Sequence, residues 1–176
     1  HDMAAFEQAF SARLLALSNT HNLLTESAWS GVELRELLTR ELEPFRDGSQ
    51  VLLSGPSVAL TSKVAIALGM AIHEMATNAT KHGAFRAGGG SVRISWSVSD
   101  ENLRLEWQER CGHPIVPPSR QGFGSRLIQQ TIVRELQGTV DTIYNNDGLQ
   151  ATFTIPLSVD DSMKDQAEAG VDLEPA

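Results

Sequence analysis

The sequence predicts an α/β fold in which helices cover one face of a mixed, mainly antiparallel sheet. Residues 63–85 are dominated by Ala, Leu, Met, Ile and Lys, which predicts one helix of about six turns. Segments 32–45 and 122–138 repeat apolar residues every three or four positions, as amphipathic helices do. Segments 91–109 and 139–157 alternate apolar and polar residues around short turns, which predicts two hairpins. We therefore expect a two-layer sandwich with three covering helices, preceded by one exposed helix.

Composition narrows the class of protein. With 176 residues, 41% of them hydrophobic and 20% charged, the chain is long enough for one well-buried domain plus an appendage. No apolar run approaches the roughly 20 residues that a membrane helix needs, and the N-terminus lacks the pattern of a signal peptide. These features predict a cytoplasmic protein without a membrane segment.

Charge and cysteine content exclude several kinds of site. A net charge of −8 without a block of Lys or Arg argues against a duplex nucleic-acid partner, whose phosphates demand clustered positive charge. An acidic protein can still bind a nucleotide through helix N-termini, a metal ion and a few basic groups. The single cysteine, Cys111, excludes an intrachain disulfide framework and a cysteine-rich zinc site, and it fits a reducing compartment.

Residues 1–3 are interpreted as a cloning remnant and are left out of the fold prediction. The first expected element is an amphipathic helix over residues 4–26. The apolar seam of this helix needs a partner helix, which a second chain can provide. His21 lies on the seam. A histidine satisfied at a helix interface is the favoured interpretation, and a phosphorylated histidine is the alternative.

The next elements follow in chain order. Helix 32–45 ends at Pro44, and residues 51–54 form a short strand. Thr61 or Ser62 then caps helix 63–85 with a side-chain oxygen.

The first hairpin should present one covered face to the helices. Its two strands, residues 91–99 and 102–109, are joined by the turn Ser-Asp-Glu-Asn. The residues expected on the covered face are Val92, Ile94, Trp96, Val98, Leu103, Leu105 and Trp107. Segment 110–121 contains three prolines and two arginines and is predicted to be an irregular, mobile loop.

The C-terminal part supplies one more helix and the second hairpin. Residues 122–124 read Gly-Phe-Gly and open a helix, past whose end Gly138 is expected as the C-cap. Segments 139–144 and 151–157 then pair around the turn Asn-Asn-Asp-Gly. From residue 159 onward the sequence is polar and is expected to be disordered.

Polar residues line one edge of the predicted long helix. Glu74, Asn78 and His82 recur at four-residue spacing, and Lys81 lies next to them. An apolar core would not tolerate this combination unpaired. We hypothesise that the edge faces a pocket for a phosphate and a divalent cation. The alternative is a solvated flank of the helix.

The Gly-x-Gly sequence is the second candidate site. Gly122 and Gly124 allow the backbone to approach a phosphate, and the helix N-terminus that follows Phe123 points N–H groups and partial positive charge toward it. Taken alone, this motif is weak, and a structural turn is the favoured interpretation.

Together these features resemble the ATP-binding domain of histidine kinases, which have a Bergerat-type fold shared with gyrase, the Hsp90 chaperone and MutL. The sequence HEMATNATKHGAF at residues 73–85 resembles an N box with an additional histidine, and WQE at 107–109 resembles the Trp-x-Glu of the HWE subfamily. The segments RLLALSNTHNLLTESAWSGVELRELL and GFGSRLIQQTIVRELQG also resemble that subfamily. The resemblance covers residues 6–157.

The resemblance implies roles for the helix edge. Asn78 would ligate the Mg²⁺ held by the ATP phosphates, as an amide oxygen is a hard ligand that needs no deprotonation. Glu74 would orient or deprotonate a water or the accepting imidazole, or else support a metal-bound water. Lys81 would approach a phosphate oxygen. His82 would either polarise a phosphate or form part of the pocket wall.

The resemblance also assigns the strand end and the loop. Glu109 stands where other histidine kinases have an aspartate that accepts a hydrogen bond from the adenine amino group, whereas Trp107 is read as a core aromatic. Cys111 and His113 depart from the usual Glu-x-Gly-Gly-Pro of the subfamily, and Gly112 alone stays in register. Further phosphate contacts are expected from Gly122, Phe123, Gly124 and Arg126, with Arg110 and Arg120 as additional candidates.

The resemblance implies a domain division and partners. Residues 4–28 resemble the second helix of a dimerisation hairpin, and residues 29–158 the catalytic domain. No His-Arg-x-x-Asn motif for the phosphate-accepting histidine is found, so the acceptor is expected in an upstream hairpin or another chain. A histidine kinase of two-component signalling, a homodimer that acts on a response regulator, is thus implied. The alternatives are an ATP hydrolase or serine kinase of the same fold, and a nucleotide-gated interaction module.

Overall fold

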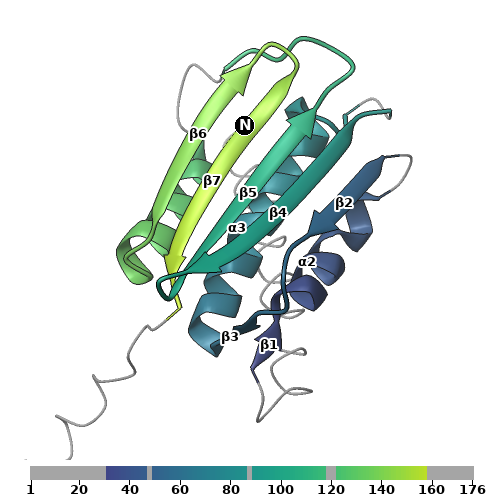
Figure 1. Ribbon diagram of the computed structural model, residues 1–176. Coiled ribbons are helices and arrows are strands. Elements are labelled where there is room, and N and C mark those ends of the chain that lie inside the picture. The colour runs from purple at the N-terminus through teal and green to yellow at the C-terminus, as the bar shows by residue number, and fades with distance from the viewer. Residues whose placement is uncertain (1–30, 47–48, 87–88, 118–121, 158–176) are drawn as a thin grey trace, which may run out of the picture.

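Helices lie on one face of a five-stranded sheet in the computed structural model, which describes residues 31–46, 49–86, 89–117 and 122–157 (Figure 1). The expected two-layer α/β sandwich is confirmed. The helix expected over residues 4–26 and the tail expected from residue 159 lie outside the described residues.

The sheet has the strand order β2-β4-β5-β7-β6 and is mixed. The pair β2–β4 is parallel, and the other three pairs are antiparallel. The strands are β2 (Gln50–Ser54), β4 (Ser91–Ser99), β5 (Asn102–Arg110), β6 (Thr139–Asn145) and β7 (Gly148–Pro156). Both predicted hairpins are therefore present.

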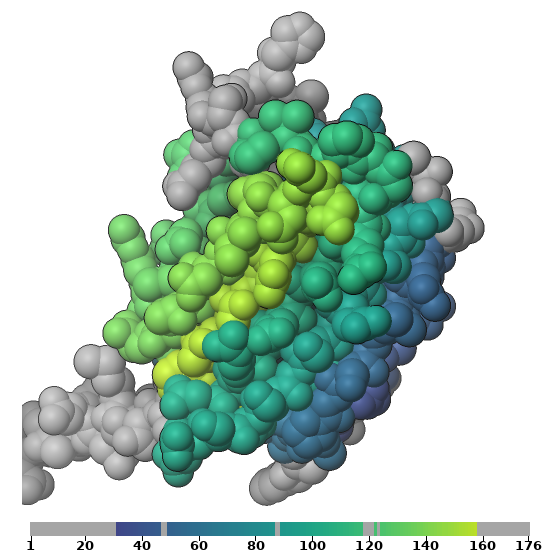
Figure 2. Space-filling view, turned by 45° about the horizontal axis from the view of Figure 1, so that its top comes forward, coloured from purple at the N-terminus to yellow at the C-terminus, as the bar shows by residue number. Residues whose placement is uncertain are grey.

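The helices are α2 (Leu34–Leu42), α3 (Ser62–His82) and α4 (Phe123–Ile128). Of the two proposed caps for α3, Thr61 is the one that acts, because its side chain accepts a hydrogen bond from the Val64 amide. In Figure 1, α2 lies behind β2, α3 crosses behind β4 and β5, and the last helix lies behind β6 and β7. The outer face of the sheet is open to solvent, with no described helix over it (Figure 2).

The second helix was predicted too long at both ends. Val32 and Glu33 form strand β1 (Val32–Glu33), which pairs with β3 (Ala59–Leu60) in a separate small sheet. Two-residue strands leave no periodic signal in a sequence, so only the long-range pairing reveals them. At the other end, the 3₁₀ turn η1 (Glu43–Phe45) contains Pro44, which has no N–H to extend the α-helix.

The last helix was predicted as regular, whereas α4 continues directly into the π-helix η2 (Gln129–Glu135). The Thr131 hydroxyl donates to the Leu127 carbonyl at 2.9 Å within this transition. The C-cap is Leu136 rather than the expected Gly138, which lies two residues further on. Gln137, with φ of 55°, takes the left-handed position, and the Gly138 amide donates to the Ile132 carbonyl at 2.9 Å.

The core lies between α3 and the inner face of the sheet. Six of the seven hairpin residues expected to be covered are buried, whereas Val98, next to the turn, is 43% exposed. Asp100 and Glu101 in that turn both have positive φ, as a two-residue hairpin loop of type I′ requires. No helix in the described part of the chain is both long and apolar enough to cross a membrane.

The segment that follows β5 is irregular, as predicted, and its start is tied to the turn between β6 and β7. The Cys111 amide donates to the Asp147 carbonyl at 2.6 Å, and the Ile115 amide donates to the Asn146 carbonyl at 3.3 Å. This turn therefore fixes where the loop leaves the sheet.

The environment of Cys111 makes its thiol less reactive at neutral pH. Burial, together with the charges of Glu109 and Asp147, raises the pKa of the thiol from 9.0 to about 11. Since the thiolate is the nucleophile, we expect alkylation of Cys111 by iodoacetamide at pH 8 to be about a hundredfold slower in the native than in the unfolded chain.

In the native chain, the rate of Cys111 alkylation should rise about tenfold per pH unit between pH 8 and 10. Mass spectrometry of the labelled peptide measures it, with Cys111→Ser as the unlabelled control. Equal rates in native and unfolded chains would contradict the packing described for this loop.

Candidate functional site

The polar residues predicted along one edge of α3 become progressively more exposed toward its C-terminus. Glu74 is 8% exposed, Asn78 is half-buried, and Lys81 and His82 are exposed. Lys81 and His82 occupy the last turn, where basic side chains complement the negative end of the helix. The edge thus runs from the buried carboxylate of Glu74 to the solvent-facing ammonium of Lys81 and imidazole of His82.

The start of α4 lies directly against this edge. Gly122 is the N-cap residue of α4, and Gly124 is half-buried in its first turn. A Cβ atom on Gly124 would collide with the carboxylate of Glu74, so only glycine fits here without displacing that side chain. The fold therefore brings the two motifs, fifty positions apart in the sequence, into contact.

The other predicted phosphate contacts are surface groups. Gly112, Arg110 and Arg126 are exposed. Arg126 lies one turn into α4, with its amide 3.3 Å from the Gly122 carbonyl. Arg120 and the side chain of Phe123 lie outside the described part of the structure.

Trp107 and Glu109 point into the interior from the end of β5. Trp107 is fully buried, as expected for a core aromatic, and Glu109 is 4% exposed. The indole Nε1 of Trp107 donates to Glu109 Oε1 at 3.0 Å. The amide of Ala84, just past the end of α3, donates to Glu109 Oε2 at 3.0 Å.

Burial also shifts the pKa of this carboxyl group. It raises the pKa of Glu109 above the ordinary value of 4.5, while the bonds from Ala84 and Trp107 act in the opposite direction. The predicted contact of Glu109 with an adenine amino group stays a prediction. In the structure, both carboxylate oxygens already accept hydrogen bonds from the protein itself.

Sequence reasoning missed the partners of Glu109. Gly83 and Ala84 were included in the long helix, but α3 ends at His82, with Gly83 as its C-cap. The signal was present, because glycine commonly follows the last turn of a helix. Strand alternation also places Glu109 on the covered face with Leu105 and Trp107, which indicates an inward carboxylate.

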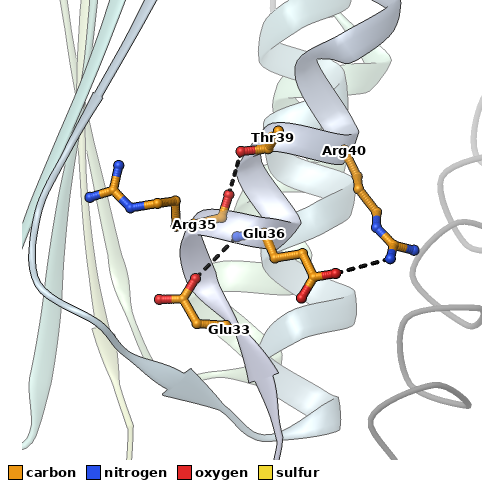
Figure 3. A pocket seen from close by; sticks show the side chains of 5 residues that line it. All are labelled: Glu33, Arg35, Glu36, Thr39 and Arg40. Carbon is orange, nitrogen blue, oxygen red and sulfur yellow. Dashed lines mark hydrogen bonds and ion pairs between the residues drawn. The ribbon is translucent and has the colours of Figure 1, made fainter.

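A different hollow, of about 450 Å³, lies along the exposed side of α2 (Figure 3). Its lining residues are Glu33, Arg35, Glu36, Thr39 and Arg40. Their charges are used within the fold: Arg40 pairs with Glu36 at 2.9 Å, and Arg35 donates to the Leu53 and Gly55 carbonyls. In Figure 3, Arg35 points toward the sheet and Arg40 toward the opposite side of the helix. Opposite charges that neutralise each other do not form an anion site, so we place the candidate site at the α3 edge.

Comparison with known proteins identifies the family. A sequence model of the HWE histidine kinase family matches residues 1–57. The blue-light-activated histidine kinase of Brucella anthropi is 32% identical over 179 residues, covering 95% of this chain and 36% of that protein. The corresponding protein of Brucella ovis is 30% identical over 164 residues, covering 90% and 34%.

Solved structures share the fold. The histidine kinase domain of the blue-light activated kinase EL346 from Erythrobacter litoralis superposes with a TM-score of 0.70 and 23% identity, covering 85% of this chain and 75% of that one. The catalytic domain of the histidine kinase ThkA gives a TM-score of 0.56 and 16% identity, covering 70% and 92%. At these identities the likeness concerns the fold alone.

The chain spans about a third of the length of the curated relatives that it matches. The family match covers its N-terminal third, and the relatives align along nearly all of it. This chain belongs to the HWE histidine kinase family.

Proposed function

We propose that this chain is the ATP-binding catalytic part of a sensor histidine kinase, which transfers the γ-phosphoryl group of ATP to a histidine imidazole. The observation that carries the proposal is the contact between Gly124 and the Glu74 carboxylate. It brings the polar edge of α3 and the Gly-x-Gly start of α4 into contact, which supports a single shared site. The Brucella relatives named above are histidine kinases, and they align with 95% and 90% of this chain.

Asn78 is the residue that would hold Mg²⁺. No group of three or more His, Cys, Asp or Glu suited to a metal ion occurs within the described ranges. Mg²⁺ does not need such a group, because it commonly takes one or two protein oxygens and completes its shell with phosphate oxygens and water. A half-buried amide on a rigid helix fits that role. The ion would neutralise phosphate charge during transfer.

The phosphates would be bound by backbone and by cations from two helices. Gly122 has no atom within 4 Å of where a side chain would begin, so the backbone there is open to a phosphate oxygen. At Gly124 that space is taken by the Glu74 carboxylate, so Gly124 and Phe123 would contribute through their backbone amides in the first turn of α4. Lys81 and Arg126 are exposed and able to turn toward the triphosphate. His82, at the end of the same helix, would either polarise a phosphate oxygen or form part of the wall. Gly112 would let the start of the loop close over the nucleotide.

Glu74 is the candidate base. In the transfer, the imidazole nitrogen forms a bond to the γ-phosphorus, the bond from that phosphorus to the bridging oxygen breaks, and ADP leaves. The imidazole proton must go to an acceptor, and the Glu74 carboxylate, one turn before Asn78, can take it. Its alternative role is to orient a water bound to the metal ion.

The partners follow from this function. The accepting histidine would belong to an upstream hairpin, of which residues 4–28 would be the second helix, and residues 29–158 would be the catalytic domain. Such hairpins pair in homodimers, and a response regulator would receive the phosphoryl group in the cytoplasm. The family membership supports these assignments.

Labelled ATP distinguishes this function from its alternatives. We expect label to appear in a separate hairpin peptide that contains the acceptor histidine, in acid-labile form, and only when that peptide is present. Release of inorganic phosphate without the peptide would favour an ATP hydrolase, and acid-stable label a serine kinase. ATP binding without either reaction would favour a nucleotide-gated interaction module.

Asn78→Asp tests the metal-binding role. A second carboxylate one turn from Glu74 would repel the triphosphate, so we expect the affinity for Mg·ATP to fall by about a hundredfold or more while α3 stays folded. Isothermal calorimetry measures the affinity, and circular dichroism the fold. The same change at Asn102, at the opposite end of β5 from Glu109, is the control. Unchanged affinity would remove Asn78 from the site.

Gly124→Ala tests the contact that unites the site. The added methyl group must displace the Glu74 carboxylate, so we expect the transfer rate at saturating ATP to fall about 10- to 100-fold. Glu74→Gln is the second variant. If Gly124→Ala acts through Glu74, the double variant Gly124→Ala/Glu74→Gln should be no slower than the slower of the two single variants. Independent, multiplying losses would show that Gly124 does not act through Glu74.

A further inference from the structure

The end of α3 is attached to β5 by a side chain rather than by backbone pairing. Glu109 bridges the indole of Trp107, on its own strand, and the amide of Ala84, with both bonds at 3.0 Å. We call these three residues and Gly83 the latch. All four are buried, so the bonds are made away from water.

The latch replaces a bond that a helix end usually makes internally. The Ala79 carbonyl accepts from the Gly83 amide and from the Phe85 amide, both at 3.0 Å. The Ala84 amide between them is satisfied by Glu109 Oε2 instead. A Cβ atom on Gly83 would collide with that same oxygen, so glycine is what lets the carboxylate reach the backbone.

Folding stability alone does not favour a carboxylate in this place. The C-terminal end of a helix carries partial negative charge, which repels it. Burial raises the pKa of Glu109, so its ionisation as the pH rises above 4.5 costs folding free energy. A neutral side chain of the same volume would avoid both costs, but it would leave the Ala84 amide or the Trp107 indole without an acceptor. A group kept despite such costs is a candidate for a positioning role.

We propose that Trp107 and Glu109 are positioning residues, which hold the peptide after α3 and thereby fix the last helical turn with Lys81 and His82, rather than contacts for the adenine base. This inference rests on the proposed function, because it concerns how the α3 edge is presented to ATP. The geometry favours it over a base contact, because the carboxylate is 4% exposed and each of its oxygens already has a donor.

Two proton signals report on the latch without any nucleotide. In NMR spectra of the full chain, the Ala84 amide proton and the Trp107 indole proton should titrate with one shared midpoint above pH 4.5. The midpoint should be absent in Glu109→Gln and unchanged in Glu106→Gln, a solvent-facing glutamate on the same strand. Cys111 and Tyr144, which feel the charge of Glu109, have raised pKa values and ionise above this range.

Trp107→Phe is the second variant, because it keeps an aromatic ring in the core and removes only the indole donor. The bond from Trp107 lowers the pKa of Glu109, so the Ala84 midpoint should move to higher pH in this variant. Signals that do not titrate together, or a midpoint that persists in Glu109→Gln, would overturn the latch.

Nucleotide affinity separates positioning from base recognition. Inosine triphosphate lacks the adenine amino group, so a base contact predicts that Glu109→Gln removes the preference for ATP. If the latch only positions the helix end, Glu109→Gln and Trp107→Phe should weaken the binding of both triphosphates by the same factor, about tenfold. The ratio of the affinity for ATP to that for inosine triphosphate should stay within about twofold of the ratio in the unmodified chain. A collapsed ratio, or unchanged affinities, would overturn the positioning role.

Failure of the proposed function gives a different result. If the unmodified chain binds neither triphosphate, the kinase assignment is wrong, and so is the proposed role of the latch in nucleotide binding. The latch itself is then decided by the two proton titrations, which need no ligand.

Discussion

The burial of one face of α3 against the sheet determines how the candidate site is arranged. Val64, Leu68 and Ile72 on that face are fully buried. Successive residues of a helix are about 100° apart, so a shift of one position would bury the polar edge and expose the apolar stripe. The sheet therefore fixes the direction of Glu74 and Asn78 before any ligand arrives. A helix held in this way costs little further ordering when a nucleotide binds.

At two places along the polar edge of α3, the backbone of a glycine lies directly against a buried carboxylate. Gly124 admits the Glu74 carboxylate at the start of α4, and Gly83 admits the Glu109 carboxylate at the end of α3. Each contact joins elements that are far apart in the sequence. The start of the loop after β5 is anchored by the turn between β6 and β7. Such a framework suits phosphoryl transfer, in which positioning and charge stabilisation supply most of the catalysis.

Much of the fold could be predicted from the sequence because its elements are strongly periodic. The long α3 and both hairpins were found at nearly their observed bounds, since alternation and helical spacing are local signals. The β1–β3 pair, the π-helical turn and the left-handed Gln137 were not, because they depend on tertiary packing. For the site, spacing alone indicated the edge formed by Glu74 and Asn78. The bond from Glu109 to Ala84 required coordinates, because nothing in the sequence specifies which backbone amide a buried carboxylate will meet.

The placement of the nucleotide at the α3 edge is tested by paramagnetic broadening, with Mn²⁺ in place of Mg²⁺. When Mn·ATP is added to the full chain, NMR signals closest to the metal ion disappear first. We expect the amide signals of Asn78, Lys81 and Gly124 to be lost first, while those of Asp100 and Glu101 in the distant β4–β5 turn persist. Broadening centred on the hollow beside α2, or on the outer face of the sheet, would contradict it.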